Sequence, residues 1–85
     1  MSIDLVYLGA LREALGRDRE RVDPPSHILT VADLAGWMAE RGGAYAKAFA
    51  PAAGVRAAVE AEMAEPETSI FGAREVALFP PPGAL

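Results

Sequence analysis

Hydrophobic residues fill two short stretches that lie near the two ends of the chain. In Ile3–Leu8 the only charged residue is Asp4. Apolar residues on both alternating faces are typical of a strand in the middle of a sheet. The second stretch is Glu75–Phe79, which lies between a turn at Gly72 and the run Pro80–Pro82. Both stretches are therefore predicted to be strands, the second being the last of the chain.

Helical spacing first appears after the opening strand. In Ala10–Leu15 the residues Leu11, Ala14 and Leu15 fall at i, i+3 and i+4, which places them on one inward face. Gly16 then supplies a C-terminal stop. A short first helix is predicted here.

The main helix is predicted over Thr30–Arg41. Asp33 follows Thr30 by three residues, which resembles a capping box with Asp in place of Glu or Gln. The apolar face of this helix consists of Val31, Leu34, Ala35 and Met38. Trp37 lies one residue off that stripe, and a core position is favoured over an interface. Gly42-Gly43 ends the helix.

Three less regular segments complete the pattern. Arg17–Val22 is highly charged, which suits an exposed edge strand or a loop. Ala44–Gly54 is rich in alanine and predicts a further helical turn followed by a loop. Val55–Glu65 predicts a β-hairpin with an acidic turn at Glu60–Glu62.

Strands interrupted by one principal helix predict an α+β domain in which a mixed sheet packs on that helix. A chain of 85 residues holds one core, so residues 1–85 are expected to form a single domain. Consecutive prolines favour the extended polyproline II conformation, so residues 80–85 could project as a tail, and the family resemblance given below favours that interpretation. The alternative is that the prolines merely terminate an edge strand.

Charge and cysteine content exclude several functions. The net charge of −4 opposes attraction to nucleic acid and to anionic membranes, so neither is expected as a partner. The absence of cysteine removes disulfides, thiolate metal sites and a cysteine nucleophile. No apolar run is long enough to span a membrane and the first residues do not resemble a secretory signal, so a cytoplasmic location is expected.

No residue pattern indicates a catalytic or metal site. His27 is the single histidine and has no partner ligand in the sequence, so a surface loop position is expected. The acidic residues of Glu60–Glu67 do not follow a Ca²⁺-loop pattern and suit a solvated hairpin. Arg56 and Arg74 are interpreted as solvated charges.

Four stretches spread along the chain carry a family resemblance. They are the first strand running into Leu11–Gly16, Thr30-Val31 with Leu34, Ala57–Val59, and Glu75–Pro81. In these stretches, and in the order of its elements, the chain resembles the MoaD family, the small subunit of molybdopterin synthase. That family consists of ubiquitin-like β-grasp sulfur carriers.

The resemblance implies a β-grasp fold and a non-catalytic carrier subunit of a sulfurtransferase complex in molybdenum cofactor biosynthesis. In the family, an E1-like activating enzyme uses ATP to adenylate the carboxylate of the C-terminus, which becomes a thiocarboxylate. The large subunit of the synthase then receives that terminus and supplies catalysis. No bound cofactor is implied for the carrier itself.

Carried over to this sequence, the resemblance implies two groups of site residues. The sulfur-carrying terminus is Gly83, Ala84 and Leu85. The surface that binds the large subunit is Tyr7, Leu78, Phe79, Pro80 and Pro81.

The chain departs from the family at its terminus. Family members end in Gly-Gly, whereas Pro82-Gly83 is followed here by Ala84-Leu85. Terminal glycines bring a carboxylate to an adenylate at the least steric cost, and Leu85 adds bulk beside the reacting carbonyl. A second hypothesis is therefore a β-grasp binding or regulatory module that has lost carrier chemistry. Glu60 is a further departure, because the family commonly has Asn there.

Overall fold

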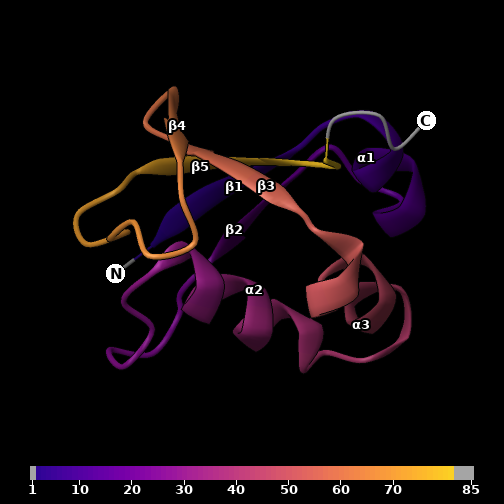
Figure 1. Cartoon of the computed structure of the whole chain (residues 1–85), viewed down its shortest axis with the longest axis horizontal. Coiled ribbons are helices and arrows are strands. Elements are labelled where there is room, and N and C mark those ends of the chain that lie inside the picture. Colours follow the sequence, from indigo (N-terminus) through magenta and orange to yellow (C-terminus); the bar gives the residue numbers. More distant parts are fainter. Residues whose placement is uncertain (1, 82–85) are drawn as a thin grey trace.

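The computed structural model describes residues 2–81 and shows a five-stranded mixed sheet with α2 and α3 on one side and α1 at one end (Figure 1). In chain order the elements are β1 (Ile3–Tyr7), α1 (Gly9–Leu15), β2 (Arg19–Val22), α2 (Val31–Ala39), α3 (Gly43–Ala48), the 3₁₀ helix η1 (Pro51–Ala53), β3 (Arg56–Val59), β4 (Glu62–Ala64) and β5 (Glu75–Phe79). This arrangement confirms the predicted α+β class.

The first and last strands lie side by side in the middle of the sheet, whose order is β2-β1-β5-β3-β4. β1 and β5 are parallel, with Asp4 opposite Glu75 and Tyr7 opposite Leu78. The other pairings are antiparallel, and β2 forms one edge, as the charge of its segment predicted. Because β1 and β5 are parallel neighbours, the chain between them must return along the sheet, and its helices cover one face of the sheet as it does so.

The main helix α2 begins with the predicted capping box. The backbone N–H of Asp33 donates to Thr30 Oγ1 at 3.1 Å, and the backbone N–H of Thr30 donates to Asp33 Oδ2 at 3.3 Å. These two backbone N–H groups, which would otherwise lack a partner at the start of the helix, thus find acceptors. The carboxylate of Asp33 also accepts a hydrogen bond from the backbone N–H of Leu29. This bond is the main reason why the pKa of Asp33 lies below its usual value.

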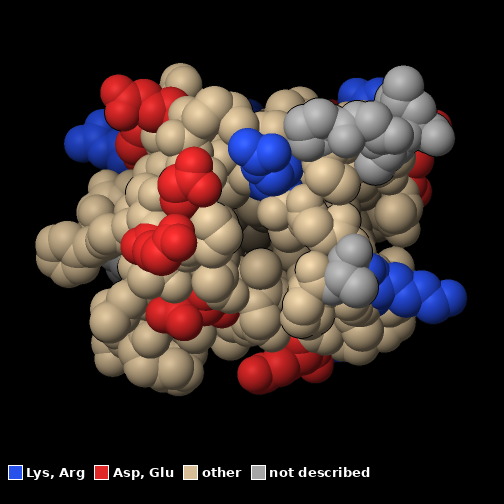
Figure 2. Space-filling model, viewed as in Figure 1, with Lys and Arg blue, Asp and Glu red and all other residues tan. Residues whose placement is uncertain are grey.

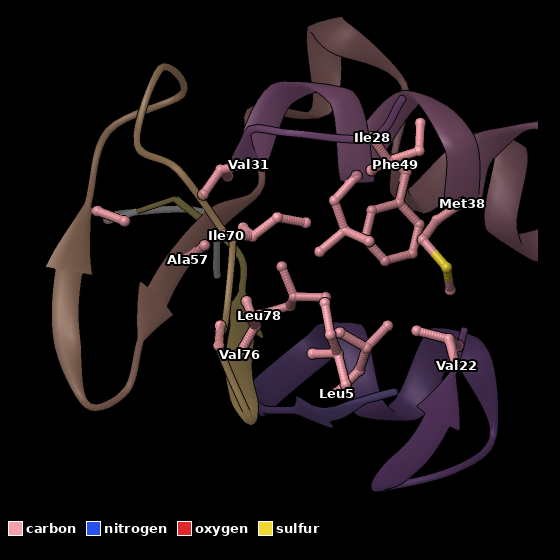
Figure 3. Close-up of a cluster of buried hydrophobic side chains, with 14 of the residues drawn as sticks. Leu5, Val22, Ile28, Val31, Met38, Phe49, Ala57, Ile70, Val76 and Leu78 are labelled. Carbon is pink, nitrogen blue, oxygen red and sulfur yellow. The ribbon is translucent and has the colours of Figure 1, made fainter. Parts of the chain in front are cut away.

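The buried face of α2 packs against the inner face of the sheet. Its buried residues are Val31, Leu34 and Met38, as predicted. Side chains of α2 point toward those of β1 and β5, with Ile70 and Phe49 filling the space beside them (Figure 3). These contacts make one continuous core.

Three local predictions were wrong. The first strand ends at Tyr7, and Leu8 lies outside it with 45% of its surface exposed. α2 ends at Ala39 because the following N–H groups, from Glu40 to Gly42, bond three residues back, which tightens the chain into a turn. Ala14 of α1 is exposed, whereas Leu11 on the same helix is buried.

A polar cluster joins the edge strand β2 to the helices. Glu20 accepts hydrogen bonds from the hydroxyls of Tyr7 (2.9 Å) and Tyr45 (3.0 Å), and its second oxygen accepts from Arg41. The guanidinium of Arg41 also lies over the rings of Tyr45 (5.0 Å) and Trp37 (5.8 Å). Trp37 is half-buried at the margin of the core.

The turn between β3 and β4 places two non-glycine residues in the left-handed region, with φ of 51° at Glu60 and 69° at Ala61. Two-residue hairpins adopt this geometry because it matches strand twist. The carboxylate of Glu60 accepts from the backbone N–H groups of Arg74 and Glu75 at the start of β5. These bonds lower its pKa and compensate for a residue type that disfavours positive φ.

Candidate functional site

The central strand β5 runs directly into the prolines at the root of the predicted tail. Leu78, near the end of the strand, still accepts a hydrogen bond from the backbone N–H of Leu8, at 2.9 Å. Pro80 then packs against Gly9, and a Cβ added to that glycine would lie 3.6 Å from Pro80 Cδ. Pro81 packs against Gly54 in the same way, with 3.6 Å from the added Cβ to Pro81 Cγ.

Both glycines have positive φ, 59° at Gly9 and 65° at Gly54, which L side chains rarely adopt. A Cβ at either position would make only ordinary van der Waals contact with the proline, so the left-handed backbone is what requires glycine there. Gly9 opens α1 and Gly54 closes η1. The root of the tail is thus held between α1 and the end of η1.

The predicted sulfur-carrying terminus, Gly83, Ala84 and Leu85, lies outside the described residues, as does Pro82. Its role stays a prediction. The structure describes the tail as far as Pro81.

The predicted partner-binding residues divide between the two faces of the sheet. Tyr7 and Leu78 are buried against the helices, with 0% and 1% of their surfaces exposed. Phe79, Pro80 and Pro81 are half-buried. Binding of the large subunit stays a prediction for all five, but only the last three present surface to a partner in this structure.

Sequence reasoning missed an apolar row that crosses the outer face of the sheet. In register, Val6 of β1 lies beside Ala77 of β5, Ala77 beside Ala58 of β3, and Ala58 beside Met63 of β4. We call these four residues the outer row. Met63 is 62% exposed and the other three are half-buried. The signal was available, because each is one residue from a core position and side chains alternate along a strand.

Ion pairs occupy the neighbouring part of the same outer face. Arg21 pairs with Asp4 at 2.8 Å, and Arg19 pairs with Glu75 at 3.1 Å. The hydrogen bond from Arg21 holds the pKa of Asp4 below its usual value. The outer face therefore joins an apolar strip to a strip of paired charges, which suits a protein interface with a polar rim.

Acidic side chains gather on the side of the molecule that carries β4 and the loop after it, on the face seen in Figure 2. Within residues 2–81 no group of three or more His, Cys, Asp or Glu side chains is placed to hold a metal ion. The carboxylate of Glu60 is engaged by backbone N–H groups. The described part of the chain thus offers two candidate contact surfaces. One is the tail root, Pro80-Pro81, and the other is the outer face of the sheet that carries the outer row, which we call the docking face.

None of the described helices is long and apolar enough to span a bilayer.

A mixed sheet wrapped on one principal helix, with an extended proline segment leaving its central strand, defines a ubiquitin-like β-grasp protein. The sequence matches the model of the ThiS family over residues 5–83. The chain belongs to that family. The match ends at Gly83, two residues before Leu85.

Two solved structures share the fold. One, from Pyrococcus furiosus, is described as molybdopterin converting factor subunit 1. It is 21% identical with a TM-score of 0.71, over 95% of this chain and 98% of that chain. The other is SAMP1 from Haloferax volcanii, 22% identical with a TM-score of 0.73, over 100% of both chains. No curated protein sequence matches the chain.

Proposed function

We propose that the chain is the sulfur-carrier small subunit of molybdopterin synthase in molybdenum cofactor biosynthesis. The observation that carries the proposal is the tail root. β5 passes from the centre of the sheet into Pro80-Pro81, which rest on Gly9 and Gly54. A terminus led away from a rigid sheet in this manner suits delivery into another protein's active site. The name of the Pyrococcus furiosus relative supports the choice of pathway.

The chemistry belongs to the terminal carboxylate. An activating enzyme joins it to the AMP moiety of ATP, and pyrophosphate leaves. A sulfide-equivalent donor then attacks the acyl carbon, AMP leaves and a thiocarboxylate forms. When the sulfur atom passes to the pterin precursor, water restores the carboxylate. The carrier contributes reach and accessibility, and its partners contribute the catalytic groups.

Two protein partners follow from this role. The large subunit of molybdopterin synthase is proposed to bind the tail, Phe79 and the outer row. An E1-like, ATP-using enzyme is proposed to bind the same end of the sheet at an earlier step, before the large subunit binds. An apolar row bordered by paired charges favours contact dominated by burial of nonpolar surface.

The second candidate is a docking module that has lost carrier chemistry. The specific observation in its favour is the sequence Ala84-Leu85 in place of the family's Gly-Gly. A leucine side chain beside the reacting carbonyl crowds an approach for which glycine is suited. This candidate retains the docking face and lacks transferable sulfur.

The two candidates differ in the mass of the chain after activation. We expect that incubation with ATP, a sulfur donor and the organism's activating enzyme adds about 16 Da, as oxygen is exchanged for sulfur. The native 85-residue chain should react poorly, and a variant ending Gly-Gly in place of Ala84-Leu85 should react well. Equal mass gain in both chains would show that Leu85 imposes no steric barrier.

Binding to the large subunit is the companion measurement. If neither chain gains mass while both bind the large subunit in calorimetry, the docking module is the correct function. If the intact chain does not bind the large subunit, the synthase role is wrong.

A further inference from the structure

A groove runs along the flank of α2, between that helix and the segment that leads into β3. Its larger part is a cavity of about 380 Å³, to which α2 contributes Ala35 and Gly36 and the facing segment contributes Gly54 and Val55. Ala35 and Val55 also line a second cavity of about 90 Å³, which extends to Arg56. We call the two cavities together the α2–β3 groove. A hollow is visible between the positions of α2 and β3 in Figure 2, which has the same orientation as Figure 1.

The wall of the α2–β3 groove is apolar. Every described residue that lines it is an alanine, glycine, valine, proline, leucine or phenylalanine, with the exception of Arg56. Leu34 and Met38, the large core residues of α2, are fully buried and do not line the groove. An apolar concavity with very few polar groups is the usual composition of a site for a small molecule.

Arg56 places a positive charge at the rim of the groove. It is half-buried, and its side chain makes no hydrogen bond or ion pair within residues 2–81. β4 pairs with β3 only from Ala57 onward, so the strand edge beside Arg56 is open. Because Ala57 faces the core and side chains alternate along a strand, the guanidinium lies at the rim and not in the depth of the groove. A partly desolvated cation without a counter-charge is complementary to an anionic group.

The backbone of Val55 supplies a second polar contact. The backbone N–H of Glu60 donates to the carbonyl of Glu75 on β5, and the direction of hydrogen bonding alternates along a strand. Continued to Val55, just before β3, this alternation turns its N–H away from β5 and toward the groove. That N–H donates no hydrogen bond within the described part of the chain. An unpaired backbone donor thus lies next to Arg56.

We propose that the α2–β3 groove binds a small aliphatic carboxylate, with its chain along Ala35 and Gly36 and its carboxylate on Arg56 and the N–H of Val55. The larger cavity has the volume of roughly a dozen water molecules, which suits a chain of about eight carbons. Glu65 and Glu67 follow β4 on this side of the molecule, but both are exposed and line neither cavity. Water screens their repulsion of the bound anion.

This binding is independent of the carrier role proposed above. It is measured on the isolated chain without ATP, a sulfur donor or a partner protein. Gly54 lines the groove and also packs against Pro81, so a bound ligand lies close to the tail root.

An NMR titration of the ¹⁵N-labelled chain with octanoate tests the site. We expect saturable shifts of the amide signals of Gly36 and Val55, with a dissociation constant of about 1 mM or below. Octanamide has the same chain without the charge and should bind about tenfold more weakly. Arg56→Gln should weaken octanoate binding about tenfold and leave octanamide unchanged. The matched control is Arg12→Gln, at an exposed cation of α1, which should change neither affinity.

Gly36→Leu tests the apolar part of the groove. A Cβ at Gly36 would meet no atom within 4 Å, and leucine favours a helix more than glycine does, so this variant should fold. Its side chain occupies the groove, and both ligands should lose at least about tenfold in affinity. Gly36→Ala is the matched control, because it improves the helix but leaves the groove open; it should bind both ligands as the native chain does.

The absence of saturable shifts at Gly36 and Val55 with octanoate would overturn the proposal. Shifts confined to the outer row would also overturn it, since the ligand would then lie on the other face of the sheet. Equal affinities for octanoate and octanamide would remove the role of Arg56, and an undiminished affinity in Gly36→Leu would remove the groove; either result contradicts the assigned site.

Discussion

The buried hydroxyl of Tyr7 donates a 2.9 Å hydrogen bond to the carboxylate of Glu20 on the neighbouring edge strand. Tyr7 has no exposed surface, so its hydroxyl needs a partner inside the protein. Tyr45 of α3 and Arg41 after α2 donate to the same carboxylate. Glu20 thus holds β2, β1 and the helical layer together at one point.

Glu20→Gln should reduce stability at neutral pH and matter less in acid. Partial burial opposes ionisation of Glu20, but the hydrogen bonds from Arg41, Tyr7 and Tyr45 outweigh it, so its pKa lies below the usual 4.5. A lowered folded-state pKa stabilises the fold above 4.5, and this contribution disappears as the pH falls through the folded pKa. We expect a loss of about 1–3 kcal/mol at pH 7 by urea denaturation.

Once the pH has fallen below the folded-state pKa of Glu20, the native chain and Glu20→Gln should become similar in stability. Glu13→Gln, at an exposed carboxylate of α1, serves as the control and should change little at either pH. A loss for Glu20→Gln that is the same at both pH values would show that shape, not charge, gives Glu20 its effect.

Leu34→Ala should cost about 2–5 kcal/mol, because the side chain lies wholly within the core and its removal leaves a cavity. That is a large share of the stability of so small a domain. Chemical denaturation measures the loss. The same midpoint as the native chain would mean that Leu34 is not a core residue in solution.

Ala61→Gly should stabilise the hairpin. Ala61 is exposed and holds φ at 69°, a conformation that costs an L residue energy and glycine little. We expect a gain of up to about 1 kcal/mol in the free energy of unfolding. The control is Ala32→Gly, where a helical φ makes glycine unfavourable and stability should fall. A loss of stability in Ala61→Gly would contradict the assigned turn geometry.

Ala77→Glu should weaken binding of the large subunit by at least about tenfold, corresponding to about 1.4 kcal/mol. Ala77 lies within the outer row, between Val6 and Ala58, where a charge would be buried on docking. Calorimetry at two salt concentrations measures both the affinity and its dependence on salt, which should be moderate. Ala32→Glu on α2 is the matched control, and an equal effect of both variants would move the interface away from the sheet.

The sequence was sufficient for the α+β class and for the existence of most strands and of the main helix, since their signals are local, but not for the order of the strands in the sheet. The Thr30–Asp33 capping box and the alternating pattern of β5 each follow from a few neighbouring residues. The docking face was assigned incompletely for a geometrical reason. Leu78 and Phe79 are adjacent in sequence yet point to opposite faces, and only the strand register with β1 and β3 shows which face is open.

The tail root was beyond sequence reasoning because its contacts join distant segments. Gly9 reads as the break after a strand and Gly54 as a loop residue, but in the structure each carries one of the prolines that follow β5. The inward position predicted for Ala14 was wrong for a related reason. Helical spacing does not reveal whether another element covers that face of the helix. Such information resides in tertiary packing and not in periodicity.

The central position of β5 also decides when the protein can fold during synthesis. β5 is synthesised after the other four strands of this sheet, and until it is made β1 and β3 each lack a neighbour. A prematurely terminated chain would expose two unsatisfied strand edges, a surface prone to aggregation and open to chaperones and proteases. Residues beyond Phe79 are therefore presented only by molecules whose sheet has had the chance to close, so translation order itself screens out incomplete chains.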